Sequence, residues 1–204
     1  MKQLKILITA GPTVEPIDPV RFISNYSTGA MGFSIAKAAK SRGHKVILIG
    51  APGALSAQEM YKQVIKNFRR CDVVVMAAAV ADYRPKAVEK QKIKKSKQQI
   101  TLKLVKNPDI LQALGKIKKD KILVGFALET KGLYKNAFSK LKKKNLDFIV
   151  ANRLTKRRNV FGSNKTSVLM LDKTGNKEYL SNVTKDKVAR RIIEKIEEIK
   201  KSAA

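Results

Sequence analysis

The chain has 204 residues, and 44% of them are apolar, which is enough for one sizeable hydrophobic core. Lysine and arginine number 44 against 16 acidic residues, and the resulting net charge of +28 favours polyanionic partners such as nucleic acids, anionic membranes or phosphorylated small molecules. One cysteine excludes an intrachain disulfide framework, and no segment approaches the ~20 apolar residues of a membrane span.

The basic residues are spread along the chain, with the densest runs at 86–106, 140–144 and 153–158. A general drift towards lysine would also produce this distribution, so only a few lysines are candidates for function. The N-terminal apolar run is too short for a signal peptide, and we therefore expect a cytoplasmic protein. With a single histidine and a single cysteine, no protein-bound metal site is expected.

The first half of the chain alternates between strands and helices. Apolar runs predict strands at 4–9, 45–49 and 72–77, an apolar face predicts a helix over 30–42, and a capping box at 56–59 opens another helix. Strands without internal alternation indicate a parallel sheet covered on both faces. The expected fold is thus α/β, a Rossmann-like three-layer architecture, in which ligands bind beyond the carboxyl ends of the strands.

The middle of the chain is less regular. Residues 86–98 are polar and lysine-rich and are expected to form a mobile flap, and the alternation of Ile100, Leu102 and Leu104 predicts a half-exposed strand. Asn107-Pro108-Asp109 is typical of a helix start, with Asn107 as the cap and Pro108 in the first turn.

The end of the chain returns to strands and helices. A buried strand is expected at 122–126, a helix follows, and another strand lies at 148–151. Turn residues between 167–171 and 177–180 predict a β-hairpin, about 165–181 in all, and a final amphipathic helix covers 188–199. We treat residues 1–204 as a single domain.

The connection from Gly11 to Thr28 has eighteen residues, far more than the ~2–6 of an ordinary βα loop, and such loops are mostly functional. It ends in NYSTGAMG, where glycines let backbone N–H groups approach an anion at a helix N-terminus. The alternative is that Gly32 serves only helix packing. Neither GxGxxG after the first strand nor a GxxxxGK[ST] loop occurs, so NAD-type and P-loop sites are not supported.

Two further segments could carry chemistry. Small residues after the third strand, AAAVADY (77–83), leave room for a ring or sugar, and Asp82 could accept a hydrogen bond, help orient a metal or simply cap a turn. A lysine from the run 90–95 could neutralise charge on a polyphosphate, although a charge run is usually a solvated face.

These segments together resemble phosphopantothenate–cysteine ligase, an enzyme family of coenzyme A biosynthesis. The motifs that carry the resemblance are ITAGPTVEPIDPVRFISNYSTGAMG, AAAVADYRP, KIKK, LVKNPDIL, VGFALET and KKNLDFIVAN, and they cover nearly the whole chain. The resemblance implies joining of 4′-phosphopantothenate to L-cysteine with CTP or ATP. An acyl-nucleotidylate forms with release of pyrophosphate, and the cysteine amine then displaces the nucleotide monophosphate.

The resemblance also implies roles for individual residues. Asn25 matches a catalytic asparagine, and Lys92 matches a flap lysine that assists nucleotidyl transfer. The nucleotide pocket is matched by Met76, Ala77, Ala78, Asp82, Lys92, Pro108, Asp109, Ile110, Leu111, Phe126, Lys140 and Lys144. Phosphate or substrate contacts are expected from Gly11, Arg21, Asn25, Ser27, Thr28, Gly29 and Gly32. Mg²⁺ is expected to arrive with CTP, with no metal ligands in the protein.

Some positions depart from the family pattern. Val14 stands where arginine is common, and FGSNKT (161–166) replaces the usual FGSDxN. The family is dimeric, so we expect a salt-sensitive homodimer with the Val168–Leu171 and Tyr179–Leu180 strands as contact candidates. A flavin-dependent decarboxylase precedes this region in many bacterial relatives, and here we expect a separate decarboxylase polypeptide.

Two other classes remain as alternatives. One is an NAD(P)-binding Rossmann oxidoreductase, and the other is a basic nucleic-acid-binding protein. The second should interleave aromatic residues with basic ones, whereas 86–106 contains no aromatic residue, so we expect neither nucleic acid nor membrane as a partner.

Overall fold

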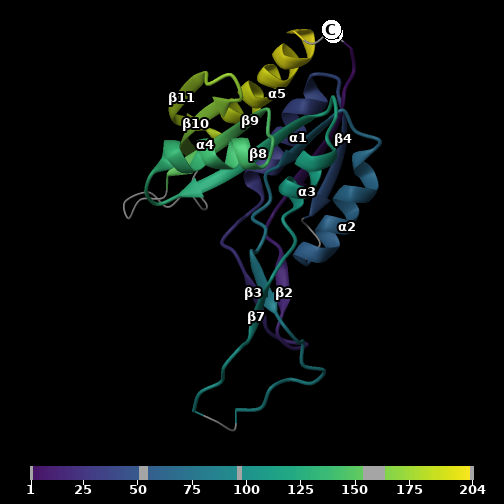
Figure 1. Ribbon diagram of the computed structural model, residues 1–204, viewed down its shortest axis with the longest axis vertical. Helices are drawn as coiled ribbons and strands as arrows, with labels where there is room; N and C mark the ends of the chain where they lie inside the picture. The colour runs from purple at the N-terminus through teal and green to yellow at the C-terminus, as the bar shows by residue number, and fades with distance from the viewer. Residues whose placement is uncertain (1, 51–54, 96–97, 154–163, 203–204) are drawn as a thin grey trace.

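A computed structural model of the chain describes residues 2–50, 55–95, 98–153 and 164–202 (Figure 1). Its centre is a seven-stranded sheet with the order β11-β10-β9-β8-β5-β1-β4. The parallel strands are β1 (Lys5–Ala10), β4 (Lys45–Gly50), β5 (Val73–Met76), β8 (Ile122–Glu129) and β9 (Phe148–Arg153). The antiparallel partners at one side are β10 (Lys165–Asp172) and β11 (Lys177–Thr184).

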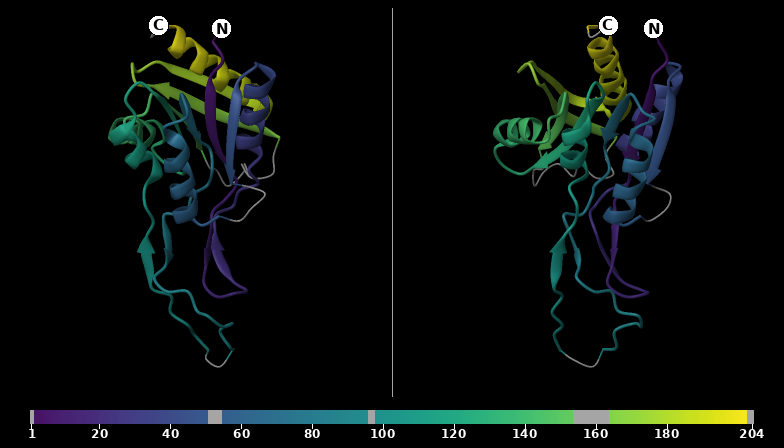
Figure 2. Two further views of the ribbon diagram at one scale, coloured as in Figure 1. Left: turned by 90° about the vertical axis from the view of Figure 1, so that its right-hand side faces the viewer. Right: turned by 45° about the vertical axis from the view of Figure 1, so that its right-hand side comes forward.

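Helices cover both faces of this sheet, as Figures 1 and 2 show. The helices are α1 (Ala30–Ser41), α2 (Ala57–Phe68), α3 (Ile110–Ile117), α4 (Leu133–Lys143) and α5 (Lys185–Ser202). Within β1, Ile6 and Ile8 join the core beneath α1 and α5, whereas Leu7 joins the core beneath α2, α3 and α4. Strands that bury both faces explain the continuous apolar runs in the sequence, and the predicted three-layer α/β fold is confirmed.

The strand order fixes where a ligand can bind. After β1 the chain moves outward to β4 and then crosses to β5 on the other side of β1. The connections after β1 and β5 therefore leave the sheet in opposite directions and open a crevice between them. Such a switch point is where open parallel sheets bind their ligands.

An arm extends from the carboxyl edge of the sheet (Figures 1 and 2). It consists of two antiparallel ribbons, β2 (Val14–Pro16) with β3 (Phe22–Ser24), and β6 (Tyr83–Pro85) with β7 (Leu104–Lys106). The long connection after β1 thus contains a ribbon that the sequence did not predict. The described part of 86–103 forms the far end of the arm and contains neither helix nor strand.

The structure corrects three local predictions. Ile100 and Leu102 lie outside any strand, because the β6 partner ends at Pro85 and pairing continues only as far as the Lys86 N–H to Lys103 carbonyl bond. The cap of α3 is Asp109, which accepts from the Gln112 N–H, so Pro108 precedes the helix. The side chain of Asn107 is instead used to donate to the carbonyl of Ala81 at 2.9 Å.

The predicted hairpin is present, but β10 lies between β9 and β11 inside the main sheet. Val168–Leu171 therefore cannot be an exposed edge, and this part of the expected dimer contact is wrong. Tyr179 and Leu180 do belong to the edge strand β11, where Tyr179 is 67% exposed. Across the described residues, no helix combines the length and apolar character needed to cross a membrane.

Candidate functional site

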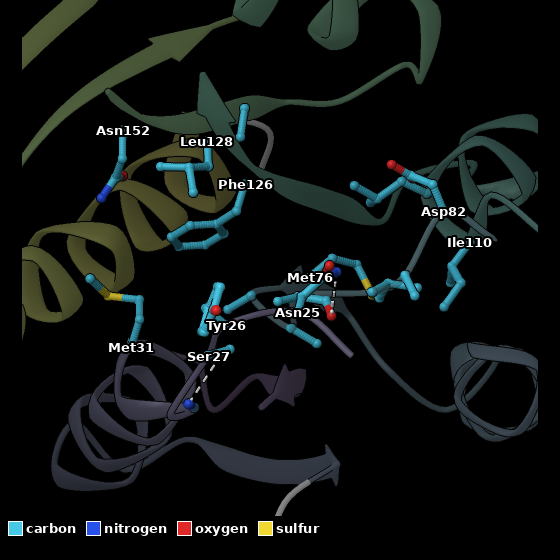
Figure 3. A pocket seen from close by; sticks show the side chains of 18 of the residues that line it. Asn25, Tyr26, Ser27, Met31, Met76, Asp82, Ile110, Phe126, Leu128 and Asn152 are labelled. Carbon is cyan, nitrogen blue, oxygen red and sulfur yellow. Dashed lines mark hydrogen bonds between the residues drawn. The ribbon is translucent and has the colours of Figure 1, made fainter. Parts of the chain in front are cut away.

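A cavity of about 650 Å³ opens at the carboxyl edge of the sheet, over the switch point between β1 and β5 (Figure 3). Side chains from the connections after β1 and β5, from β8, and from the starts of α1 and α3 converge on it. The predicted site residues that line it are Asn25, Ser27, Thr28, Gly29, Met76, Ala77, Ala78, Asp82, Pro108, Asp109, Ile110, Leu111, Phe126, Lys140 and Lys144.

The floor of the cavity is held by hydrogen bonds between the two connections at the switch point. The N–H of Ala79 donates to the Gly11 carbonyl at 2.9 Å, and the N–H of Thr13 donates back to the Ala79 carbonyl at 3.2 Å. The fully buried Thr13 hydroxyl accepts from Ala81 N–H at 2.9 Å, and the Thr9 hydroxyl accepts from Ala78 N–H at 3.1 Å. The alanine-rich stretch after β5 is therefore fixed in place while its small side chains leave space above it.

The N-terminus of α1 faces this space. Its N-cap, Gly29, has φ of 75°, and its Cβ-free backbone comes close to the backbone of Gly11. Gly29 has no side chain that could cap the helix, and no acidic residue stands in the first turn of α1 to offset the positive end of the helix dipole. The hydroxyl of Thr28 lies 3.4 Å from the Ala30 N–H, a long bond that an anion can replace. This end of the cavity is therefore suited to a phosphate.

Lysines of α4 line another wall. Lys140 pairs with Glu129 at 2.7 Å, and Lys144 pairs with Asp109 at 2.8 Å. Burial alone would raise the pKa of Glu129, but hydrogen bonds from Lys140 and Asn136 outweigh it and hold that pKa below its ordinary value. Both lysines are thus oriented at the cavity by these carboxylates, and an anionic ligand would compete with the two carboxylates for them.

Asp82 differs from these carboxylates. It is exposed at the cavity, and no ion pair involving it is present among the described residues. The described residues contain no group of three or more His, Cys, Asp and Glu that could hold a metal ion by themselves. Mg²⁺ commonly binds through one or two carboxylates plus substrate phosphates and water, so a single carboxylate here fits Mg²⁺ carried by a nucleotide.

Asn25 lies between two sides of the cavity. In Figure 3, Phe126, Leu128 and Met31 lie on one side of it, and Asp82 and Ile110 lie on the other. Its side-chain amide donates to the Ala79 carbonyl at 3.3 Å. This long bond leaves the Asn25 amide available to a ligand at the centre of the cavity.

Four predicted site residues do not line the cavity: Gly11, Arg21, Gly32 and Lys92. A Cβ on Gly32 would lie 2.6 Å from the Ala10 Cβ, so this glycine lets α1 pack on β1, and its expected phosphate contact stays a prediction. Gly11 lies under the α1 terminus, where its carbonyl accepts from Ala79. Arg21 and Lys92 both lie in the arm, and Arg21 is paired with Asp18.

Other lining residues were missed from the sequence, among them Tyr26, Met31, Asn107, Leu128, Asn152, Thr166 and Lys185. Asn152 could have been found, because it stands at the carboxyl end of β9, where a polar residue after an apolar run points to a site. Lys185 opens α5 some thirty positions later, and no local signal links it to the cavity. Residues 161–163 of the FGSNKT segment and residues 154–158 of the basic run lie outside the described residues.

Comparisons with known proteins show the family to which this chain is related. Residues 1–199 match the family described as DNA/pantothenate metabolism flavoprotein C-terminal domain. The chain is 44% identical over 94% of its length to a cysteine/cysteine sulfinic acid decarboxylase from an unknown prokaryotic organism. It is 43% identical over 95% of its length to the coenzyme A biosynthesis bifunctional protein CoaBC of Borreliella burgdorferi (strain ATCC 35210 / DSM 4680 / CIP 102532 / B31).

The alignments span only 57% of the first relative and 52% of the second. Among solved structures, the C-terminal domain of a CoaBC protein superimposes with a TM-score of 0.82 and 38% identity, covering 99% of this chain and 98% of that one. The chain therefore belongs to the DNA/pantothenate metabolism flavoprotein C-terminal domain family.

Proposed function

We propose that this chain is a ligase of coenzyme A biosynthesis that joins 4′-phosphopantothenate to L-cysteine. CTP activates the phosphopantothenate carboxylate as an acyl-cytidylate, pyrophosphate leaves, and the cysteine amine then displaces CMP. The observation that carries the proposal is the cavity itself. It combines an uncapped helix N-terminus, two oriented lysines and an aromatic ring with the side-chain amide of Asn25.

The nucleotide has a physically reasonable place in this cavity. The half-buried ring of Phe126 offers a surface for the base, and small residues after β5 leave room for the ribose. The N-terminus of α1, Lys140 and Lys144 supply positive charge for the phosphates. Nucleotidyl transfer depends mainly on such positioning and charge neutralisation, and it requires no protein nucleophile.

Magnesium would neutralise phosphate charge when it binds with the nucleotide, and the exposed Asp82 would be its protein ligand, which departs from the expectation of no metal ligand in the protein. The protein's own contribution to this step is to orient the triphosphate between α1 and α4. Its contribution to the second step is the Asn25 amide, whose N–H donors can stabilise the negative charge that develops on the acyl oxygen as the amine attacks.

Lys92 belongs to the first half-reaction in this proposal, although it lies outside the cavity of its own chain. Its role requires the arm as a whole to bring the segment 86–95 to a nucleotide-loaded cavity, either in its own chain or in the second chain of the proposed homodimer. In either case an ammonium group near the α-phosphate would stabilise charge that builds up during transfer.

The test separates the two half-reactions. Pyrophosphate release from CTP is measured with phosphopantothenate alone and again with cysteine added. Asn25→Ala should still form the intermediate but lose amide formation by about 10²–10³-fold, the usual cost of losing one oxyanion donor. Lys92→Ala should suppress pyrophosphate release in both conditions.

Two control variants on α2 match these substitutions. Asn67→Ala and Lys62→Ala remove the same side-chain types from the α2 helix, neither of them lining the cavity, and should keep wild-type turnover. If Asn25→Ala and Lys92→Ala behaved like these controls, the assigned roles would be wrong. If the wild-type protein released no pyrophosphate with any nucleoside triphosphate, the ligase assignment would fail.

A further inference from the structure

An ion pair in the arm, with a buried carboxylate and a partly exposed guanidinium, carries a further inference. Asp18 lies in the turn between β2 and β3, and its side chain is wholly inaccessible to solvent. Its Oδ1 accepts from the N–H groups of Val20 and Arg21 at 2.8 Å each, which closes the turn. Its Oδ2 accepts from Arg21 Nε at 2.9 Å and from the N–H of Ile93 at 3.1 Å.

The ion pair makes two hydrogen bonds to the main chain of Ile93. The Arg21 Nη2 donates to the Ile93 carbonyl at 2.7 Å, while Asp18 accepts from the N–H of the same residue. One ion pair thus holds both main-chain polar groups of a residue more than seventy positions away in the sequence. A further bond, from Glu89 N–H to the Ile17 carbonyl at 2.9 Å, ties the same segment to the same turn.

The electrostatics favour this arrangement. Burial on its own would raise the pKa of Asp18, but the N–H groups of Val20, Ile93 and Arg21 and the Arg21 guanidinium outweigh burial and lower it strongly. The carboxylate therefore stays ionised, and hydrogen bonds to an ionised acceptor are the stronger kind. A buried charge with several donors tolerates little displacement of any of them, because each lost donor leaves it less compensated.

The held residue lies next to Lys92. The segment 86–95 contains neither helix nor strand, so its position depends on a few bonds of this kind. Ile93 is flanked by Lys92 and Lys94, whose side chains are exposed and form no ion pair within the described part of the chain. Because the bonds use only main-chain atoms of Ile93, they fix where the neighbouring lysine side chains begin without engaging them.

We propose that Asp18 and Arg21 form a clamp on the backbone of Ile93, and that both act as positioning residues for Lys92 in nucleotidyl transfer. The functional half of this inference rests on the proposed ligase activity and on the role of Lys92 within it. It also changes the expected role of Arg21. The Arg21 guanidinium donates to Asp18 and to the main-chain carbonyl of Ile93. It therefore acts by positioning the segment that carries Lys92 instead of binding a substrate phosphate.

The clamp itself is tested without any activity measurement. Asp18→Asn keeps an oxygen for the turn but replaces the second acceptor with an amide donor, which cannot accept from Ile93. Arg21→Met removes the guanidinium and keeps an unbranched stem. Arg191→Met, which breaks the ion pair between Arg191 of α5 and Glu178 of β11, is the matched control.

The readouts are amide hydrogen exchange at Ile93 and limited trypsin cleavage after Lys92, whose scissile bond carries the held N–H. Both clamp variants should speed exchange at Ile93 by about tenfold or more and raise cleavage after Lys92, because local protection scales with the bonds that must open. Arg191→Met should change neither rate. Exchange at Ile93 that is as fast in the wild type as in both clamp variants would overturn the clamp.

The positioning role is tested by pyrophosphate release. Asp18→Asn and Arg21→Met should each lower kcat and leave the KM for phosphopantothenate within about twofold, and should add little to Lys92→Ala, since residues acting as one unit are not additive. A raised KM for phosphopantothenate that persists in the Lys92→Ala background would show that Arg21 binds substrate and would overturn this role. Full activity of Lys92→Ala would also overturn it, while the exchange data would still decide the clamp.

Discussion

Substituting Gly32 by alanine tests how closely the cavity depends on helix packing. The added Cβ would lie 2.6 Å from the Ala10 Cβ, 2.9 Å from the Thr9 carbonyl oxygen and 3.0 Å from the Ala10 Cα. All three are backbone or Cβ atoms of the buried strand β1, so none can rotate away. To reach ordinary contact distance, α1 must move off the sheet by several tenths of an ångström or more.

Two opposing energies decide the outcome. Alanine is better than glycine inside a helix by about 1 kcal/mol. Overpacking a well-filled core costs about 1–3 kcal/mol, and backbone contacts this short belong in the upper part of that range. We therefore expect Gly32→Ala to lose about 1–2 kcal/mol of stability, or about 2–8 °C in Tm for a chain of this size.

The assay is thermal unfolding followed by calorimetry, combined with the KM for CTP. Because α1 carries the uncapped terminus at the cavity, a displaced helix should raise that KM as well. Ala10→Gly removes the nearest clashing atom. Its effect on stability should therefore be more favourable in the Gly32→Ala background than in the wild-type background. A Gly32→Ala protein at least as stable as wild type would refute the packing argument.

Three further changes follow from the described contacts. Phe126→Ala should raise the Kd for CTP about 5- to 150-fold, since stacking a base on an aromatic ring is worth about 1–3 kcal/mol, and titration calorimetry would measure this change. The hydrogen bond from Arg42, opposed by burial and assisted by His44, lowers the pKa of Glu197 below its ordinary 4.5. The stability that ionised Glu197 contributes is therefore fully present above about pH 4.5, and it is lost as the pH falls through the lower folded-state pKa. Glu197→Gln should make the free energy of unfolding less dependent on pH in that acidic range. Burial raises the pKa of the Cys71 thiol, which is 2% exposed, so its reaction with a disulfide reagent should follow the rate of unfolding.

Much of the core was predictable because its signals are local. The apolar runs of β1, β5 and β8 and the capping box at Ser56 each specify an element within a few residues. The capping box is present in full, with Ser56 and Glu59 bonding each other's backbone N–H groups. The parallel order then followed from the alternation of strands and helices, and with it the edge where a ligand must bind.

What the sequence could not show depends on contacts between distant residues. The start of β7 is set by its pairing with β6 in the arm. Because β6 ends at Pro85, Ile100 and Leu102 lie outside β7. Gly32 and Gly29 stand three residues apart in one motif, yet one packs on β1 and the other opens to the cavity. Asp18 accepts a hydrogen bond from Ile93, which lies in a segment without hydrophobic periodicity. No sequence pattern near Ile93 therefore predicts this bond.

A crystal structure with CTP and Mg²⁺ bound would test the central claim most directly. The account predicts the base against Phe126, the phosphates between the N-terminus of α1 and the lysines at 140 and 144, and Mg²⁺ between the phosphates and Asp82. Nucleotide density outside the crevice between β1 and β5, with that cavity left empty at saturating CTP, would contradict it.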